Sequence, residues 1–336
     1  MTALQHQRPG LKTWSVLSGT RKRPSEYEIL TYKLHARTRN PQSPYEQDPD
    51  TMMNTWYKTY VVGSPLTHPD WDSFRDPDQL TYRAYTTMQD GQEQYVDGLL
   101  NDHDENGHDK GLSPAWVATL AALYTPMRYV MAAGQMASAY LVQTAPASTI
   151  TNAAAFQETD YFRWISRIAY RTRELANAHP DQGFATGERE RFETLPAWQG
   201  MRELIEKALI AYDWGECFFA FNVVAARAIE EACVRQVGLA ARRNGDTLTA
   251  MMCDNHMRDA ARSRRWTGVL VRQCLTVESN KAVIDGWLAK WVPLADKAMT
   301  AFCVGLPDSP EAGAAAKAAC ADFRRELGLG MPAGVA

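Results

Sequence analysis

Two short strings decide how this chain is interpreted: Asp160-Tyr161-Phe162-Arg163-Trp164 and, about a hundred residues later, Asp259-Ala260-Ala261-Arg262-Ser263. Each lies in a stretch whose apolar residues recur at helical spacing, which predicts two long helices. A di-iron centre in a four-helix bundle takes a Glu-x-x-His pair from each of two helices, because residues i and i+3 share one face. An Asp-x-x-Arg string can equally be an ordinary ion pair within one helix, so only the wider pattern can decide.

The inward faces of the two predicted helices contain both strings. Apolar stripes join Tyr161 to Ile150, Ala154, Ile165, Ile168 and Thr172, with Trp164 at the edge, and join Ser263 to Met252, His256, Leu270 and Cys274. We therefore expect the residues at i+1 and i+4 of each string to point into the bundle. A remodelled metal site that uses Tyr161 and His256 stays open as an alternative.

A di-iron bundle also needs a lone carboxylate from each of its other two helices. No acidic residue occurs between Asp109 and Glu158, so a helix over 114–144 cannot supply one. The only remaining stretch that could contribute is 196–241, with Glu206, Asp213, Glu216, Glu230 and Glu231. The sequence predicts that this chain does not bind a di-iron centre.

Composition limits the possible functions further. The chain has 336 residues, 45% hydrophobic and 22% charged, and its net charge of −3 gives no basic footprint for nucleic acid or anionic lipid. The N-terminus lacks the apolar core of a signal peptide, and the longest apolar run, 116–124, is too short to span a bilayer, so we expect a cytoplasmic protein. Six cysteines without a C-x-x-C pair are typical of structural thiols rather than disulfides or zinc ligands.

Proline content divides the chain. Eight of the seventeen prolines and nine aromatic residues precede residue 79, where no helical or strand period persists. Residues 1–78 are therefore predicted to form an extended arm, whose rings must be buried on the chain's own body or, as we expect for part of the arm, on a partner subunit. Residues 79–304 are predicted to be the helical domain, and residues 305–336 a peripheral helix and a frayed tail.

Caps, prolines and glycines set the expected helix limits. A first helix should follow the cap Asp76-Pro77-Asp78 and end near Asn101, and a stretch over 114–144 should bend or divide at Thr125-Pro126. The other expected helices cover about 148–178, 188–193, 196–241, 247–276, 281–303 and 309–327. No strand pattern or internal repeat is present, and the predicted fold class is all-α.

One true Glu-x-x-His string exists, Glu105-Asn106-Gly107-His108, within the polar segment 101–111. Asn-Gly and the dense Asp residues favour a turn, where i and i+3 no longer share a face. We interpret the segment as a solvated connector, with weak cation binding as the alternative. No P-loop, dinucleotide-binding fingerprint or nucleophile-elbow motif is present in the sequence.

Several longer strings resemble a known family. They include Asp76-Pro77-Asp78-Gln79-Leu80, Gln89-Asp90-Gly91-Gln92-Glu93, Ala145-Pro146-Ala147-Ser148-Thr149-Ile150-Thr151-Asn152 and Asp213-Trp214-Gly215-Glu216. They resemble the β subunit of bacterial multicomponent monooxygenase hydroxylases, and most strongly the toluene (aromatic) branch. The resemblance covers about residues 11–306.

The resemblance implies a ferritin-like helical bundle related to that of the α subunit, which holds the di-iron centre in this family. The family's ligand pattern is D-E-x-R-H, and its Glu and His positions are occupied here by Tyr161 and Trp164, then by Ala260 and Ser263. We therefore predict no catalytic, cofactor-binding or metal-binding residue in this chain, and core packing at these four positions.

The implied function is indirect. The chain would be the non-catalytic, structural β subunit of an NADH-dependent hydroxylase that inserts one oxygen atom of O₂ into a small aromatic hydrocarbon. The implied partners are the α and γ subunits in a paired αβγ complex, a small effector protein, a Rieske ferredoxin with a [2Fe-2S] centre, and a flavin reductase with FAD. The alternatives are the β subunit of a related alkene monooxygenase and a stand-alone ferritin-like metal enzyme.

Overall fold

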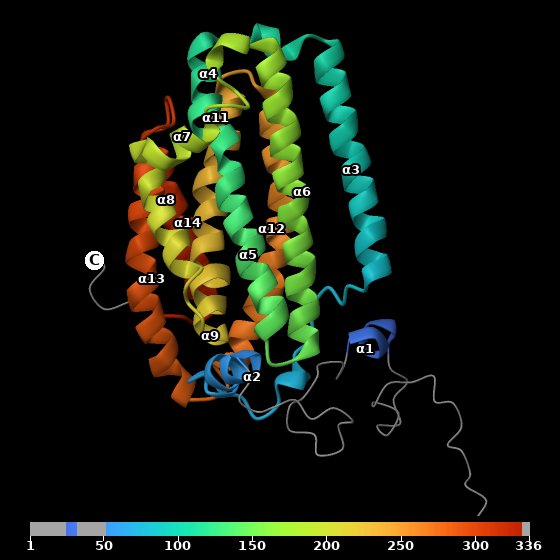
Figure 1. Cartoon of the computed structure of the whole chain (residues 1–336), viewed down its shortest axis with the longest axis vertical. Coiled ribbons are helices and arrows are strands. Elements are labelled where there is room, and N and C mark those ends of the chain that lie inside the picture. The colour runs from blue at the N-terminus through green and yellow to red at the C-terminus, as the bar shows by residue number, and fades with distance from the viewer. Residues whose placement is uncertain (1–24, 32–51, 331–336) are drawn as a thin grey trace, which may run out of the picture.

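The computed structural model describes residues 25–31 and 52–330, and this part of the chain contains helices and no strand (Figure 1). The predicted all-α class is confirmed. The long helices lie roughly along one axis, and they are α3 (Tyr82–Glu105), α5 (Arg128–Thr144), α6 (Ser148–Ala178), α8 (Pro196–Ala208), α12 (Thr247–Cys274), α13 (Ser279–Cys303) and α14 (Ala312–Glu326).

Shorter helices complete the bundle and its ends. The α-helical ones are α1 (Glu26–Thr31), α2 (Met52–Tyr57), α4 (Pro114–Thr119), α7 (Glu188–Thr194), α9 (Trp214–Phe218), α10 (Ala226–Ala228) and α11 (Val237–Arg243). Segments of π-helix cover Lys58–Val62, Leu120–Tyr124, Phe219–Ala225 and Ile229–Gln236, and 3₁₀ turns cover Trp71–Ser73, His108–Gly111, Thr125–Met127 and Pro180–Gln182. The predicted division at Thr125-Pro126 is confirmed, because a 3₁₀ turn there separates α4 and its π-helical continuation from α5.

Side-chain caps explain two differences from the expected helix limits, and in a third α3 continues past Asn101 to Glu105. The helix predicted to follow Asp78 begins at Tyr82, because the Thr81 side chain accepts the N–H of Ala84, while the Asp76 carboxylate shapes the preceding turn. The continuous helix expected over 196–241 is interrupted at 209–213. Asp213 restarts it as the N-cap of α9, accepting the N–H groups of Gly215 and Glu216.

The described part of the predicted arm packs on the chain's own bundle, which is one of the two surfaces expected for its rings. It is also partly helical, and the sequence did not indicate these helices. Trp56 Nε1 donates a hydrogen bond to the Tyr140 hydroxyl at 2.9 Å, and the Trp71 ring meets the Trp214 ring edge-on at 4.9 Å. Ser148 Oγ at the start of α6 donates to the Thr31 carbonyl at 2.6 Å, and within the arm the buried Tyr27 hydroxyl accepts the N–H of Asp76. The rest of the arm lies outside the described residues, so its contact with a partner stays a prediction.

One large apolar core joins most of the helices. It includes the fully buried indoles of Trp116, Trp198, Trp214, Trp266 and Trp291. Helix α14 contributes Ala312, Ala316 and Cys320 to this same core, so it is packed into the body of the bundle. All six cysteines are buried and free, as predicted. None of the described helices is long and apolar enough to cross a bilayer.

Candidate functional site

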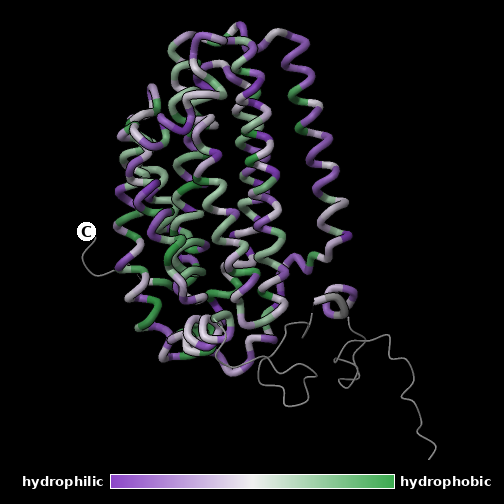
Figure 2. Tube along the Cα trace, in the orientation of Figure 1, coloured by the Kyte–Doolittle hydropathy of each residue, from purple (hydrophilic) through white to green (hydrophobic). Residues whose placement is uncertain are grey.

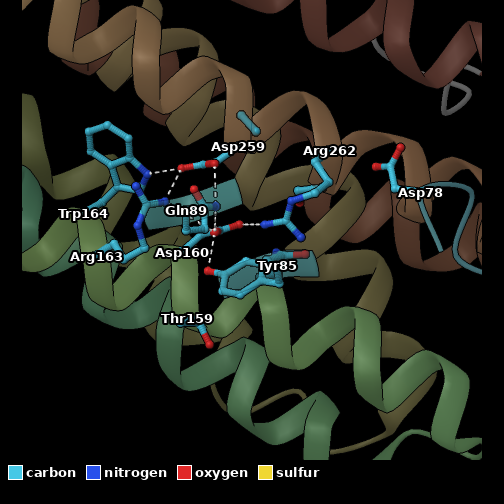
Figure 3. A network of polar contacts seen from close by, with 12 residues as sticks. Asp78, Tyr85, Gln89, Thr159, Asp160, Arg163, Trp164, Asp259 and Arg262 are labelled. Carbon is cyan, nitrogen blue, oxygen red and sulfur yellow. Dashed lines mark hydrogen bonds and ion pairs between the residues drawn. The ribbon is translucent and has the colours of Figure 1, made fainter. Parts of the chain in front are cut away.

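The two Asp-x-x-Arg strings meet at the centre of the interface between α6 and α12 (Figure 3). Arg163 Nη1 lies 2.9 Å from Asp259 Oδ2, and Arg262 pairs with Asp160. Within one helix, by contrast, Arg163 is 3.7 Å from Asp160. The expected ion pair within one helix is present in the first string as the longer contact of Arg163. Each arginine also pairs with the carboxylate of the other helix, and Arg163 pairs in addition with Glu93 of α3 at 2.6 Å.

Helix α3 supplies two side chains that donate hydrogen bonds to these carboxylates. The Tyr85 hydroxyl donates to Asp160 Oδ1 at 2.7 Å, and Gln89 Nε2 donates to Asp160 Oδ1 at 2.9 Å and to Asp259 Oδ1 at 3.0 Å. Gln89 thus bridges the two buried acids (Figure 3). Burial raises the pKa of Tyr85 to about 12, so its hydroxyl remains a donor across the physiological range.

The four residues at the expected ligand positions all point inward, as predicted. Tyr161, Trp164, Ala260 and Ser263 are buried. Trp164 Nε1 donates to Asp259 Oδ2 at 2.8 Å, and its ring stacks on the imidazole of His256 with 4.3 Å between ring centroids. Indole, phenol, methyl and hydroxymethyl side chains therefore fill the places where a Glu-x-x-His pair would face its partner pair.

His256 has no set of further ligands around it, because no group of three or more His, Cys, Asp or Glu side chains among the described residues is placed to hold a metal ion. Burial, together with the nearby Arg163 guanidinium, lowers the pKa of its imidazole to about 3, so the ring is neutral at physiological pH. One face of the ring is covered by Trp164. Tyr161 lies against the Gly134 backbone, and burial raises the pKa of its hydroxyl, which opposes formation of a phenolate.

A small cavity of about 20 Å³ remains at this centre, with room for about one water molecule. Its lining residues are Gln157, Asp160, Tyr161, Trp164, Glu230, His256, Asp259, Ala260 and Ser263. Of the five acids named above for 196–241, and of Glu203, which the same stretch also contains, only Glu230 lines the cavity. The others have different roles: Asp213 caps α9, Glu203 pairs with Lys207, Glu206 with Arg202, Glu216 with Lys290, and Glu231 with Arg235.

The cation nearest to Glu230 is a guanidinium group. Arg227 Nη2 lies 2.7 Å from Glu230 Oε1 and donates to Ser263 Oγ at 3.2 Å, and Arg264 Nε lies 3.1 Å from Glu230 Oε2. Burial raises the pKa of Glu230, while these two guanidinium groups oppose the rise. Arg227 therefore supplies the positive charge that a buried carboxylate requires, at the helix where a metal-binding carboxylate would stand.

The residues present do not fit a di-iron centre. Two of the four bundle helices carry no ligand at the required positions, and α4–α5 carry no acid. Each of the three carboxylates that line the cavity, Asp160, Asp259 and Glu230, is paired with an arginine. Among the residues that the structure describes, no group of three or more His, Cys, Asp or Glu side chains is placed to hold a metal ion.

The polar segment 101–111 is largely exposed, in agreement with the predicted solvated connector, but it also contacts the start of α12. Helix α3 continues through it to Glu105, and Glu105 and His108 do not form a shared ligand face. His108 Nε2 instead lies 3.1 Å from Asp246 Oδ1, and Trp116 Nε1 donates to Asp246 Oδ2 at 2.9 Å. Asp246 caps α12 through the N–H of Thr249, so this segment anchors the start of that helix.

Sequence reasoning missed the roles of Tyr85, Gln89 and Arg227. Gln89 occupies a buried position on a helix face otherwise occupied by Tyr85, Val96 and Leu100. A glutamine on a buried face needs a buried polar partner, and this signal could have pointed to the carboxylates. Which helices supply the carboxylates that Gln89 contacts could not be told from the sequence alone.

Comparison with known proteins identifies relatives across most of the chain. The family model "Methane/Phenol/Alkene Hydroxylase" matches residues 56–278. The hydroxylase component subunit beta of the toluene-4-monooxygenase system of Ectopseudomonas mendocina is 48% identical over 87% of this chain and 89% of its own length. An oxygenase component of phenol 2-monooxygenase from Pseudomonas sp. strain CF600 is 24% identical over 83% of this chain and 82% of its own.

Solved structures agree with this relation. A chain from toluene 4-monooxygenase with toluene bound in its resting active site superposes with a TM-score of 0.85 at 46% identity, covering 89% of this chain and 98% of that one. A chain from phenol hydroxylase of Pseudomonas sp. OX1 has a TM-score of 0.80 at 20% identity, covering 98% of this chain and 99% of that one. The second similarity concerns the fold alone.

Proposed function

The chain belongs to the methane/phenol/alkene hydroxylase family, and we propose that it is the structural β subunit of the hydroxylase component of a toluene-type monooxygenase. The observation that carries the proposal is the replacement at the bundle centre. Tyr161, Trp164, Ala260 and Ser263 stand at the Glu and His positions, and Arg227 pairs with Glu230, the acid of 196–241 that lines the cavity. The 48% identical relative of nearly the same length supports the assignment to this subunit.

In this proposal the oxygen chemistry belongs to a partner α subunit, whose di-iron centre would insert one atom of O₂ into a small aromatic hydrocarbon. NADH, FAD and a [2Fe-2S] centre would serve the system through a flavin reductase and a Rieske ferredoxin. A γ subunit and a small effector protein would complete a paired αβγ assembly in the cytoplasm. This chain contributes a rigid bundle, because Asp160 and Asp259 connect α3, α6 and α12 through a buried network of hydrogen bonds and ion pairs.

Co-expression tests the proposal. The chain is produced alone and together with the subunits encoded beside it, and iron, subunit stoichiometry and toluene hydroxylation are measured on each purified sample. We expect a stable complex in which iron travels with another subunit, and we expect the isolated chain to bind no stoichiometric iron. Stoichiometric iron in the isolated chain would support the stand-alone metal enzyme and overturn the proposal.

The β subunit of an alkene or alkane monooxygenase is the second candidate. The hydroxylase component small subunit of propane 2-monooxygenase from Rhodococcus jostii is 23% identical over 87% of this chain. The chain is 48% identical to the toluene-4-monooxygenase subunit, about twice as much, and this difference favours an aromatic substrate. Competition between toluene and propene for the assembled hydroxylase separates the two, since preferential oxidation of propene would support the second candidate.

A further inference from the structure

Two small cavities at the bundle centre share the stacked pair Trp164 and His256 in their linings. The first is the cavity of about 20 Å³ described above, which we name the central cavity, and most of its lining side chains are polar. The second, which we name the apolar cavity, has about 10 Å³, and its other lining residues are Tyr124, Met127, Ile168, Val234, Met252 and Cys253. Buried water requires polar partners, so the two cavities should differ in what they hold.

His256 contributes a polar ring without a hydrogen-bond partner to the central cavity. Only 6% of its surface is exposed, and its contacts in the described part of the chain are the stack on Trp164 and the nearby charge of Arg163. Because the lowered pKa keeps the ring neutral, it carries one N–H donor and one acceptor nitrogen. Buried polar groups are ordinarily hydrogen-bonded, so this ring requires a partner that the described residues do not supply.

Three further side chains that line the central cavity have hydrogen-bonding capacity left. Gln157 Oε1 accepts a side-chain amide at 2.8 Å, but its buried Nε2 has no partner in the described part of the chain. Ser263 Oγ accepts Arg227 Nη2 at 3.2 Å, so its own O–H remains to donate. Glu230 pairs with Arg227 at 2.7 Å, and a carboxylate can accept further hydrogen bonds. With His256, these groups supply the roughly two to four polar partners that a buried water requires.

Helix α3 does not supply these missing partners. It is mainly hydrophilic along its length (Figure 2), but none of its residues lines the central cavity. Tyr85 and Gln89 donate instead to Asp160 and Asp259, whose carboxylates also pair with arginines. The remaining hydrogen bonds of the central cavity therefore require a small polar molecule inside it.

We propose that the central cavity binds one ordered water molecule, which joins Glu230 and Ser263 to Gln157 and His256. The volume of about 20 Å³ exceeds the roughly 10–15 Å³ that one water needs and excludes a larger ligand. The water connects α6, α12 and the π-helical segment Ile229–Gln236, so it cross-links elements from which a di-iron centre would take its ligands. The inference concerns this chain alone and does not depend on the partner subunits.

Filling each cavity by one carbon atom tests the difference between them. Ser263→Thr adds a methyl group at the central cavity and keeps the hydroxyl, and Val234→Ile adds one carbon at the apolar cavity as the matched control. Overpacking should affect the smaller apolar cavity at least as much. We expect Ser263→Thr to lower the Tm of the full-length chain by about 2–4 °C, because the expelled water leaves Gln157 and His256 without a partner. We expect Val234→Ile to lower it less.

A crystal structure that resolves internal waters gives the direct test. We expect one density peak in the central cavity of the wild type, within hydrogen-bond distance of at least two of the four side chains named in the proposal, and no such peak in Ser263→Thr. A central cavity without density, or a Tm of Ser263→Thr at or above that of the wild type, overturns the water site alone. Anomalous scattering at the iron absorption edge from the same point overturns the proposed function as well, so the two failures are distinguishable.

Discussion

At the scale of single residues, Asp246 combines three tasks: it caps α12, accepts the Trp116 indole and pairs with His108. Burial alone would raise the pKa of this carboxyl, but hydrogen bonds from His108, Trp116 and Thr249, with the charge of Arg171, lower it to about 2 from an ordinary 3.8. A lowered pKa means that the ionised form stabilises the folded chain.

The stability contributed by Asp246 is complete above about pH 4 and is lost as the pH falls toward 2. We expect Asp246→Asn to lower the free energy of unfolding at pH 7 by about 2 kcal/mol and to flatten its decline over this acid range. Urea unfolding at pH 7, 4 and 3 measures both effects. Asp322→Asn is the control, since Asp322 is exposed. The expectation would be contradicted if the free energy of unfolding of Asp246→Asn fell between pH 7 and pH 3 as much as that of the wild type.

Gly134 is required by close packing against Tyr161. A Cβ atom at this position would lie 2.6 Å from two ring atoms of Tyr161. We expect Gly134→Ala to lower the free energy of unfolding by about 1–3 kcal/mol through overpacking, although alanine favours helix. Gly98→Ala, in open space, should raise it instead. Thermal unfolding of both variants checks the opposite signs.

At the scale of elements, the exchange of arginines holds α6 and α12 together. Arg163 and Asp259 are both largely buried, but Arg163 keeps its ion pair with Glu93 when Asp259 is neutralised. We expect Asp259→Asn alone to cost about 1–3 kcal/mol of unfolding free energy, because it weakens hydrogen bonds to a charged group without leaving Arg163 unpaired. A double-mutant cycle with Arg163→Met should give a larger coupling for Arg163 with Asp259 than for Arg163 with Asp160. Equal coupling energies would show that the pair Arg163–Asp160 within α6 is as strong as the pair Arg163–Asp259 between α6 and α12.

The sequence predicted the elements better than their connections. The 31-residue helix Ser148–Ala178 was predicted at its observed limits, because its apolar stripe and the His179-Pro180 stop are local signals. The interruption at 209–213 was missed, although Asp213 and Glu216 form the capping pattern that marks a new helix. The exchange between Arg163 and Arg262 could not be predicted, since it depends on the relative placement of helices far apart in the sequence.

At the scale of the whole molecule, the arm contributes to the bundle and, in our proposal, to assembly. Truncation of residues 1–60 would remove Thr31 and Trp56, which contact the chain's own bundle, so loss of assembly in that variant would be ambiguous. Truncation of residues 1–24 leaves both in place. We expect this shorter truncation to keep the wild-type Tm but to weaken association with the other subunits, as measured by size-exclusion chromatography of the co-expressed complex. Unchanged association would contradict a partner-binding role for those residues.

The crossed arrangement of Arg163 and Arg262 also constrains how this subunit can evolve. Because each arginine pairs with the acid of the opposite string, a substitution in one string removes an ion-pair partner from the other. The two strings, though about a hundred residues apart, should therefore change together or remain unchanged. Among homologous β subunits, we expect statistical covariation between positions 163 and 259 and between 160 and 262 to exceed that between the residues of one string.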